Sequence, residues 1–369
     1  MKIGILTQPL ANNYGGVLQN WALQQALKHM GHVPITLNIP YPHIREKYDL
    51  VRTSWRLLKR LKGDKSILFI NADKQQNFLN TPCENLRQFV VDNIDVMDLP
   101  GKVDSSFCDE HPEIEAFIVG SDQVWRKAFS PYLPNYFLDF IEGFDVGRVA
   151  YGVSFGRKEM DVSQDELPYY SELASRFDAI SVREEDGKEI CKKQLNSSAS
   201  LVIDPTLLID PSEYFELIND VESHEKSNRY AAVYVLDRNK QKEIIINIFC
   251  NKNGLIPKYI GYPSSKGFQS VESWLNDIAN SQYVITDSYH GTIFSILFRK
   301  PFTSICNPSR GASRFITLLT ALGLENRLIN EGERFIPLSE SINFTEVYAK
   351  ISDRRSESIA FLKKSLGNV

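Results

Sequence analysis

The chain has 369 residues, which at roughly 150 residues per domain predicts two or three domains. Hydrophobic residues make up 43% of the chain and aromatic residues 11%, enough apolar area to fold, so a disordered protein is excluded. A net charge of -4 lacks the basic excess of nucleic-acid-binding proteins, so we expect no nucleic-acid partner, and no apolar run approaches the roughly 18 residues of a membrane-spanning helix.

The first half of the chain alternates short apolar runs with helical periodicity. Residues 2–7 predict a buried strand, and the polar, glycine-containing turn at 12–16 precedes a helix that ends at Gly31. Further strands are predicted at 33–38, 116–120, 148–155, 178–182 and 201–203. Segment 43–110 is less regular, and its basic stretch 52–65 suits either a solvated helix or a surface that meets an anionic acceptor or membrane.

A second alternating series begins near residue 229. Its predicted strands are 230–236, 258–261, 283–286 and 301–305, and its predicted helices are 240–251, 271–279, 291–298, 314–322 and 344–366. Two such series predict an α/β protein with two Rossmann-like parallel-sheet domains that face each other across a cleft. We expect the domains to span residues 1–200 and 201–342, with a C-terminal helix in 343–369 that packs back across them.

The cysteines and the N-terminus favour a cytoplasmic protein. The five cysteines are scattered and contain no Cys-x-x-Cys pair, as in chains kept reduced. Polar residues interrupt the first apolar run before the core of a secretion signal can form. His29 and His32 lie close together, but no second pair has the spacing of metal ligands, so we expect no metal.

Polar residues and glycines follow most of the predicted strands. Because ligands of open parallel sheets bind beyond the carboxyl ends of the strands, we expect these residues to form a binding site. The candidates are Asn13, Tyr14, Gly15, Gly16, Ser121, Asp122, Gln123, Ser154, Asp204, Asp287, Ser288, Tyr289 and Gly291. Gly15 and Gly16 would let the backbone approach an anion closely, although adjacent glycines are also common in plain tight turns.

His290 is the strongest candidate for a catalytic residue. It lies at the start of a predicted helix, where it could donate a proton to a developing anion. The helix dipole disfavours a charged imidazole, so a carboxylate would have to compensate, and Asp287 is the nearest in sequence. The alternative is a structural histidine that only caps the helix or forms hydrogen bonds within the core.

Three arginines suit the binding of carboxylate or phosphate groups. Arg183 ends a predicted strand, and Arg310 and Arg314 precede a helix, where anions are favoured. The alternatives are an ion pair of Arg183 with Glu184 and Glu185, and plain surface charge for the other two arginines. No nucleophile elbow, P-loop or dinucleotide fingerprint is present, so covalent catalysis is not indicated.

Several motifs, in this order along the chain, resemble those of the polysaccharide pyruvyl transferase family. They are Asn-Tyr-Gly-Gly-Val-Leu-Gln at 13–19, Val-Gly-Ser-Asp-Gln-Val-Trp at 119–125, Ser-Val-Arg-Glu at 181–184, Val-Ile-Asp-Pro-Thr at 202–206 and Thr-Asp-Ser-Tyr-His-Gly at 286–291. The resemblance spans about residues 1–325. It implies a fold like that of two-domain GT-B glycosyltransferases, with the site in the cleft.

The resemblance also implies an activity: transfer of a pyruvyl group from phosphoenolpyruvate to a sugar, which forms a pyruvate ketal and releases phosphate. It implies His290 as the general acid and Arg183 as a ligand of the donor's anionic groups. Characterised members often carry an arginine where this chain has Ser288, so Arg310 and Arg314 are candidates to supply that charge. No organic cofactor or metal is needed for this chemistry.

The acceptor implied by the resemblance is a sugar or lipid-linked glycan precursor of a surface polysaccharide such as an exopolysaccharide. Such an acceptor would bring the protein to the inner face of the membrane. Two other functions stay open: a glycosyltransferase that uses a nucleotide sugar in the same cleft, and a non-catalytic sugar- or phosphate-binding protein. A preference for a nucleotide over phosphoenolpyruvate would indicate the glycosyltransferase. If His290→Ala changed nothing at all, that would indicate the binding protein.

Overall fold

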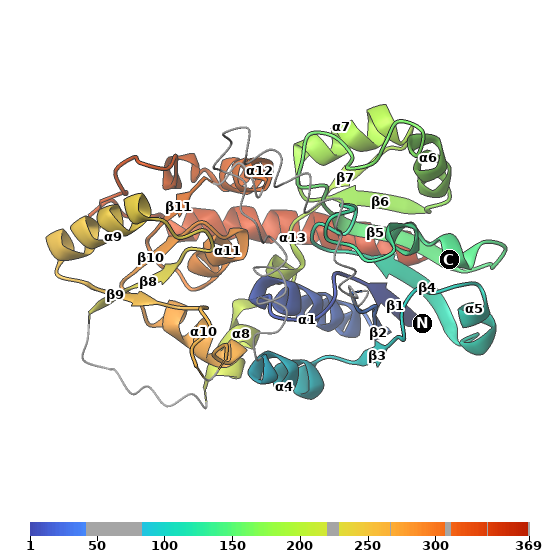
Figure 1. The fold of residues 1–369 in the computed structure, drawn as a ribbon, viewed down its shortest axis with the longest axis horizontal. Coiled ribbons are helices and arrows are strands. Elements are labelled where there is room, and N and C mark those ends of the chain that lie inside the picture. The colour runs from blue at the N-terminus through green and yellow to red at the C-terminus, as the bar shows by residue number, and fades with distance from the viewer. Residues whose placement is uncertain (42–82, 220–228, 266, 307–310, 338, 368–369) are drawn as a thin grey trace, which may run out of the picture.

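The ribbon of a computed structural model shows two parallel sheets, each flanked by helices (Figure 1). The structure describes residues 1–41, 83–219, 229–265, 267–306, 311–337 and 339–367. The basic stretch 52–65 and Arg310 lie outside the described residues. The prediction of two parallel-sheet α/β domains is confirmed.

The N-terminal sheet has seven parallel strands in the order β3-β2-β1-β4-β5-β6-β7. The strands are β1 (Lys2–Leu6), β2 (Val33–Asn38), β3 (Val96–Asp98), β4 (Ile114–Val119), β5 (Gly147–Val153), β6 (Ala179–Val182) and β7 (Ser200–Leu201). The helices are α1 (Tyr14–His29), α4 (Glu84–Asn93), α5 (Ser106–Glu110), η1 (Leu133–Phe137), η2 (Asp139–Ile141), α6 (Leu167–Ser175) and α7 (Glu185–Gln194). The strand order reverses beside β1 and β4, the place where ligands of doubly wound sheets bind.

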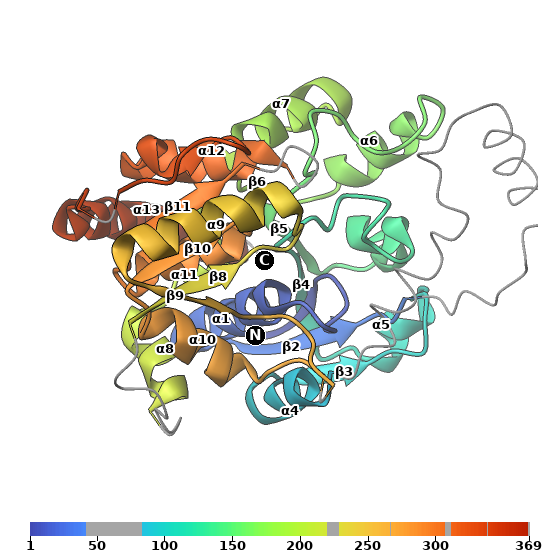
Figure 2. The ribbon, with the colours of Figure 1, turned by 60° about the vertical axis from the view of Figure 1, so that its left-hand side comes forward.

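The C-terminal sheet has five parallel strands in the order β12-β11-β10-β8-β9. The strands are β8 (Tyr230–Tyr234), β9 (Ile256–Tyr259), β10 (Tyr283–Thr286), β11 (Phe302–Ile305) and β12 (Leu328–Ile329). The helices from the linker onward are η3 (Pro205–Leu207), α8 (Pro211–Ile218), α9 (Lys240–Asn253), α10 (Val271–Ala279), α11 (Tyr289–Leu297), α12 (Ala312–Leu322), η5 (Glu325–Arg327) and α13 (Phe344–Gly367). Helix α9 covers one face of this sheet (Figure 2).

The two domains share a continuous apolar core in which α1 is central. The ring of Tyr14, at the start of α1, stacks on Trp274 of α10 with centroids 5.2 Å apart and an interplanar angle of 10°. Its hydroxyl donates to the backbone oxygen of Gln269 at 2.8 Å. Aromatic pairs of this kind add about 0.5–1.5 kcal/mol beyond the burial of their area. The substrate-binding role predicted for Tyr14 therefore gives way to a structural one, because its side chain is buried between the domains.

Helix α13 joins the two domains a second time. It runs across both sheets in Figure 1 and packs against α12 and β5. The hydroxyl of Ser358 accepts a hydrogen bond from the backbone N–H of Ile203 at 3.1 Å, and the ring of Phe361 lies 6.3 Å from that of Tyr151. The C-terminal helix therefore holds the linker and the N-terminal sheet as well as its own domain.

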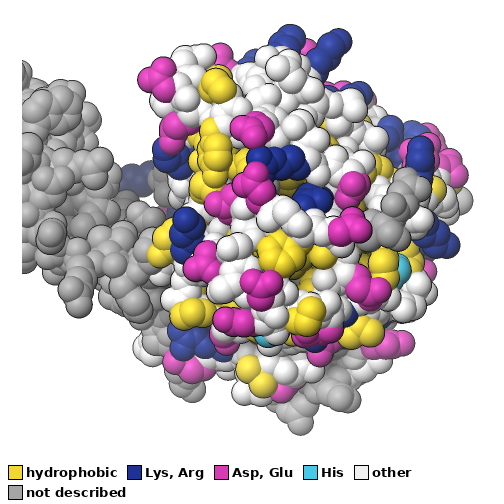
Figure 3. Space-filling view, turned by 90° about the vertical axis from the view of Figure 1, so that its right-hand side faces the viewer, with side chains coloured by type: hydrophobic (Ala, Val, Ile, Leu, Met, Phe, Trp, Pro, Cys, Tyr) yellow, Lys and Arg dark blue, Asp and Glu magenta, His cyan; other side chains and the backbone are white. Residues whose placement is uncertain are grey.

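Among the described residues, the face of the molecule seen in Figure 3 carries charges of both signs. Lys and Arg side chains are interspersed there with Asp and Glu (Figure 3), in keeping with the net charge of -4. None of the helices within the described part of the chain combines the length and apolar character needed to cross a membrane.

Candidate active site

The carboxyl ends of strands from both sheets converge on one group of charged residues. Asp122 follows β4, Arg183 follows β6, and Asp204 follows β7, all from the N-terminal side. His290 and its neighbour Tyr289 come from the start of α11, after β10 of the other sheet. With Glu184 and Arg314, we call these residues the central cluster; all seven are buried.

Arg183 is held by two carboxylates at the base of the central cluster. Its Nη2 lies 3.0 Å from Oδ1 of Asp122, and its Nη1 donates to Oδ2 of Asp204. Its side chain is fully buried, and although burial alone would lower the pKa of its guanidinium, the charges of Asp204 and Asp122 outweigh it and raise that pKa. The predicted alternative was an ion pair of Arg183 with Glu184 and Glu185. Instead, Arg183 pairs with the two aspartates, and Glu185 pairs with Lys188 at 3.1 Å.

Asp204 is oriented by the short turn that follows it. Its Oδ1 accepts hydrogen bonds from the backbone N–H and the hydroxyl of Thr206 at 3.0 and 2.7 Å, which caps η3. This leaves Oδ2 for Arg183 and for Nε2 of His290, which lies 3.6 Å away. Burial alone would raise the pKa of Asp204, but the charges of Arg183 and His290 outweigh it and hold that pKa well below its usual range.

The imidazole of His290 packs directly on Gly15 of α1. A Cβ atom placed on Gly15 would lie 2.0 Å from Nδ1 of His290, so any larger residue would push the ring away. The close approach predicted for Gly15 is therefore an approach to His290. Ser288 caps α11 through a bond from the N–H of Gly291 to its hydroxyl at 3.3 Å, which fixes the turn that carries His290.

The sequence analysis named Asp287 as the carboxylate that would pair with His290, but in the structure Asp287 has other partners. Its two oxygens accept hydrogen bonds from the N–H groups of Leu236 and Asp237 at 2.5 and 3.1 Å and from Nζ of Lys242 at 3.0 Å. These contacts bind the loop after β8 to the loop after β10. The carboxylate that lies beside His290 is Asp204.

Tyr289 lies close to two guanidinium groups. The guanidinium carbons of Arg183 and Arg314 lie 5.2 and 5.1 Å from the centroid of its ring. Arg314 also approaches Oδ1 of Asp122, with its Nη1 at 3.4 Å. Burial would raise the pKa of Asp122, but Arg183 and Arg314 outweigh it and keep the carboxyl ionised. Of the two arginines predicted to replace the charge missing at Ser288, Arg314 thus belongs to the central cluster.

Glu184 is a buried carboxyl of a different kind. Its Oε1 accepts hydrogen bonds from the hydroxyl of Ser154 at 2.7 Å and from the N–H of Phe155 at 3.2 Å. Its Oε2 is buried with no partner among the described residues. Burial raises the pKa of Glu184, and the nearby charge of Arg183 only partly offsets this. Glu184 therefore favours the protonated form more than an ordinary glutamate does.

The structure adds one residue that the sequence analysis did not single out. Arg126 is buried, donates to Oε1 of Gln123 at 2.8 Å and lies 4.3 Å over the ring of Phe129. Burial lowers the pKa of Arg126, and the positive charges of Arg157 and Arg314 lower it further. The only sequence signal is that it follows Trp125 at the end of the second motif.

The remaining predicted residues support the loops around the central cluster. Ser121 is fully buried and donates to the backbone oxygen of Gly152 at 3.0 Å. Asn13 caps α1 through its backbone oxygen and packs against Gly16, whose Cβ would lie 3.1 Å from its amide nitrogen. A Cβ on Gly291 would lie 2.3 Å from the hydroxyl of Thr286. Within the described residues, no group of His, Cys, Asp and Glu could hold a metal ion.

Fold and site together define a two-domain α/β enzyme whose reacting groups would come from the strand ends of both domains. The model of the polysaccharide pyruvyl transferase family matches residues 13–307, which is most of the chain. The protein therefore belongs to the polysaccharide pyruvyl transferase family and is a transferase. The resemblance seen in the sequence motifs is confirmed.

Several solved structures have a similar course of the chain at low sequence identity. MnaA of S. aureus in complex with UDP has a TM-score of 0.48 and 11% identity, over 98% of this chain and 91% of that one. UDP-GlcNAc 2-epimerase from Neisseria meningitidis has a TM-score of 0.47 and 9% identity, over 99% and 94%. MurG of Acinetobacter baumannii has a TM-score of 0.40 and 7% identity, over 98% and 94%. A comparison with curated proteins gave no match.

Proposed function

We propose that the protein transfers the enolpyruvyl group of phosphoenolpyruvate to a sugar of a surface-polysaccharide precursor and forms a pyruvate ketal. The observation that carries this proposal is the family match over residues 13–307. The central cluster supports it, because it brings an imidazole, two arginines and a carboxylate into contact, the groups that such a reaction requires.

The reaction needs an acid and a site for anions. A proton is added to the methylene carbon of phosphoenolpyruvate, and the neighbouring carbon becomes electron-deficient. One sugar hydroxyl adds to that carbon, the bond to phosphate breaks, and a second hydroxyl adds. The two hydroxyls lose two protons in all: one balances the proton gained by the methylene carbon, and the other leaves with the phosphate. A diol and phosphoenolpyruvate therefore give a ketal and phosphate. Acid catalysis of this kind contributes about 10²–10⁴-fold.

His290 is the proposed acid, and Asp204 is its positioning residue. The carboxylate of Asp204 lies 3.6 Å from Nε2 of His290, where it can orient the imidazole. Gly15 fixes the ring from the other side, because a Cβ there would overlap the imidazole.

Arg314 is the proposed direct ligand of the donor's carboxylate or phosphate. Both Nη atoms of Arg183 are occupied by Asp122 and Asp204, so Arg183 is suited to hold the carboxylates and to contribute its charge from beneath. The Nη1 of Arg314 lies 3.4 Å from Asp122, and its guanidinium carbon lies 5.1 Å from the centroid of the Tyr289 ring. No metal or organic cofactor is part of this proposal.

The experiment uses the full chain with ¹³C-labelled phosphoenolpyruvate and glycan precursors extracted from bacterial envelopes. We expect a mass gain of one pyruvate less one water on a sugar, with one phosphate released per transfer. Unlabelled phosphoenolpyruvate and the His290→Gln variant are the controls. Transfer of a sugar from UDP-GlcNAc, with none from phosphoenolpyruvate, would overturn the proposal and support a glycosyltransferase.

A further inference from the structure

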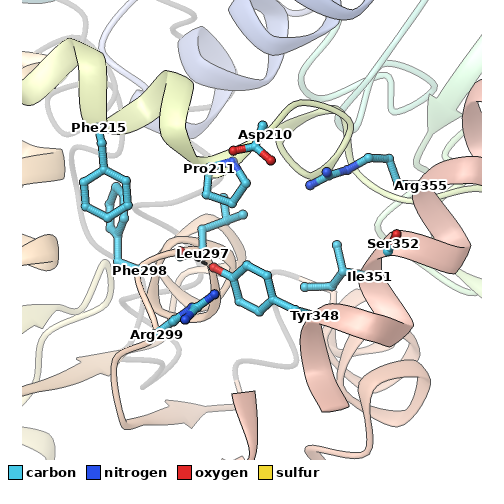
Figure 4. A pocket seen from close by; sticks show the side chains of 10 residues that line it. All are labelled: Asp210, Pro211, Phe215, Leu297, Phe298, Arg299, Tyr348, Ile351, Ser352 and Arg355. Atoms are coloured by element: carbon cyan, nitrogen blue, oxygen red, sulfur yellow. Dashed lines mark hydrogen bonds between the residues drawn. The ribbon is translucent and has the colours of Figure 1, made fainter. Parts of the chain in front are cut away.

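A cavity of about 450 Å³ lies between α8, the end of α11 and α13 (Figure 4). This volume falls within the range of about 300–1,000 Å³ that is typical of sites for small molecules. The cavity is separate from the central cluster. His290 begins α11 and Leu297, which lines the cavity, ends it, so the two are roughly 10 Å apart along the helix axis.

One side of the cavity is apolar. Phe215 and Phe298 meet there edge to face with centroids 5.1 Å apart, beside Pro211 and Leu297, while Ile351 lies across the cavity (Figure 4). Phe215 leaves 43% of its surface exposed, which is unusual for an aromatic side chain of this size. This side therefore offers an apolar surface to a ligand.

The lining is also cationic. Arg299 and Arg355 extend into the cavity from opposite directions in Figure 4. Nε of Arg355 donates to the backbone oxygen of Leu207 at 2.8 Å, which fixes the guanidinium. Asp210 is the acidic residue of the lining, and its carboxylate accepts hydrogen bonds from the N–H and hydroxyl of Ser212 at 2.9 and 2.7 Å. The lining thus has two positive side chains against one negative one that caps its own helix.

The backbone of Arg299 is left-handed, with a φ of 53°. It follows the C-cap of α11, and the bond from the N–H of Lys300 to the oxygen of Ser295 at 2.8 Å closes the turn. Glycine is the usual residue at this position because it adopts such a φ without strain. The chain has an arginine there instead, with its guanidinium carbon 4.6 Å over the ring of Tyr348. Strain of this kind is found where a side chain has a function.

We infer that this cavity binds a phosphomonoester that carries an apolar group. The phosphate would lie between Arg299 and Arg355, since two guanidinium groups match its geometry and charge. The apolar group would lie on Phe215 and Phe298. This ligand is distinct from phosphoenolpyruvate, and its site is independent of the proposed function of the central cluster.

The test is calorimetry on the full chain with phenyl phosphate and geranyl phosphate. Inorganic phosphate and phenol are the matched controls that carry only the charge or only the ring. We expect both phosphomonoesters to bind at least about tenfold more tightly than either control. Tighter binding of phenyl phosphate would indicate an aromatic ligand, as in a nucleotide, and tighter binding of geranyl phosphate an isoprenoid one.

Arg299→Gly is the decisive variant, because glycine suits the backbone and should keep or raise the melting temperature. We expect it to weaken phenyl phosphate binding about tenfold. Arg334→Gly removes the same charge from an exposed position outside the cavity and should leave the affinity unchanged. Phe215→Ser should weaken binding of phenyl phosphate but not of inorganic phosphate. Equal affinities of Arg299→Gly and the parent protein, or no saturable binding, would overturn the inference.

Discussion

Asp204 and Asp287 both follow parallel strands closely, one in each domain, yet they have different surroundings. Asp204 uses one oxygen for the turn at Thr206 and offers the other to Arg183 and His290. Asp287 gives both oxygens to a neighbouring loop and to Lys242. The difference is that Asp204 alone of the two keeps an oxygen that faces His290 of the other domain.

His290 is the partner that distinguishes Asp204 from Asp287. We expect its replacement to have the largest effect on kcat. His290→Gln should lower kcat by at least about 100-fold, because general acids contribute about 10²–10⁴-fold. The melting temperature should change little, since glutamine fills similar space. Pyruvyl transfer is measured by phosphate release with a competent acceptor. A kcat within a few-fold of the parent protein would remove His290 from the chemistry.

The paired variants Asp204→Asn and Asp287→Asn test the comparison itself. Each removes one carboxylate from a buried cation, Arg183 or Lys242, so each should destabilise the protein by up to about 3 kcal/mol. Only Asp204→Asn should also lower kcat and shift the alkaline limb of its pH profile, because it alone loses contact with His290, the proposed acid. Chemical denaturation and pH–rate profiles of both variants provide the measurement. The same pH profile in both variants would contradict the distinction.

Gly15→Ala tests whether the position of the imidazole matters. The added Cβ would lie 2.0 Å from Nδ1 of His290 and must displace the ring. We expect kcat to fall at least about tenfold, because a catalytic group displaced by about 1 Å can lose up to about 100-fold in rate. Helix α1 should not suffer, because alanine is the better helix former by about 1 kcal/mol. Gly367→Ala, which meets nothing within 4 Å, is the matched control and should be silent.

Glu184→Gln should give the smallest effect, seen in the pH dependence of stability. Burial raises the pKa of Glu184 in the folded protein, so its contribution is fully present below the unfolded pKa and is lost as the pH rises through the folded one. Glutamine keeps an acceptor for Ser154 and carries no charge. Between pH 4 and 8 the variant should therefore lose less stability than the parent protein. Urea denaturation across that range would contradict this if the two curves stayed parallel.

Most of the fold follows from periodicity, and the exceptions have physical reasons. Strands β3 (Val96–Asp98) and β12 (Leu328–Ile329) were not predicted, because runs of three and two residues are too short to show alternation. The side chains of β3 are also partly exposed, so no apolar run marks it. The long strands and the amphipathic α13 bury whole faces and are visible in the sequence.

The central cluster could be predicted as a set of residues but not as a set of contacts. Strand-end placement identifies Asp122, Arg183, Asp204 and His290, since parallel strands end at one edge. Their pairing could not be read, because Asp204 meets His290 across two domains. Tyr14 shows the reverse case: a position beside the site whose ring the partner domain buries against Trp274.

The central claim is that phosphoenolpyruvate binds at the central cluster. Calorimetry on the full chain with phosphoenolpyruvate, beside UDP-GlcNAc, tests it most directly, with Arg314→Leu and Arg299→Gly as variants. We predict one saturable site for phosphoenolpyruvate that is lost in Arg314→Leu and retained in Arg299→Gly, whose change lies at the distant cavity. Saturable binding of UDP-GlcNAc without binding of phosphoenolpyruvate would contradict the claim.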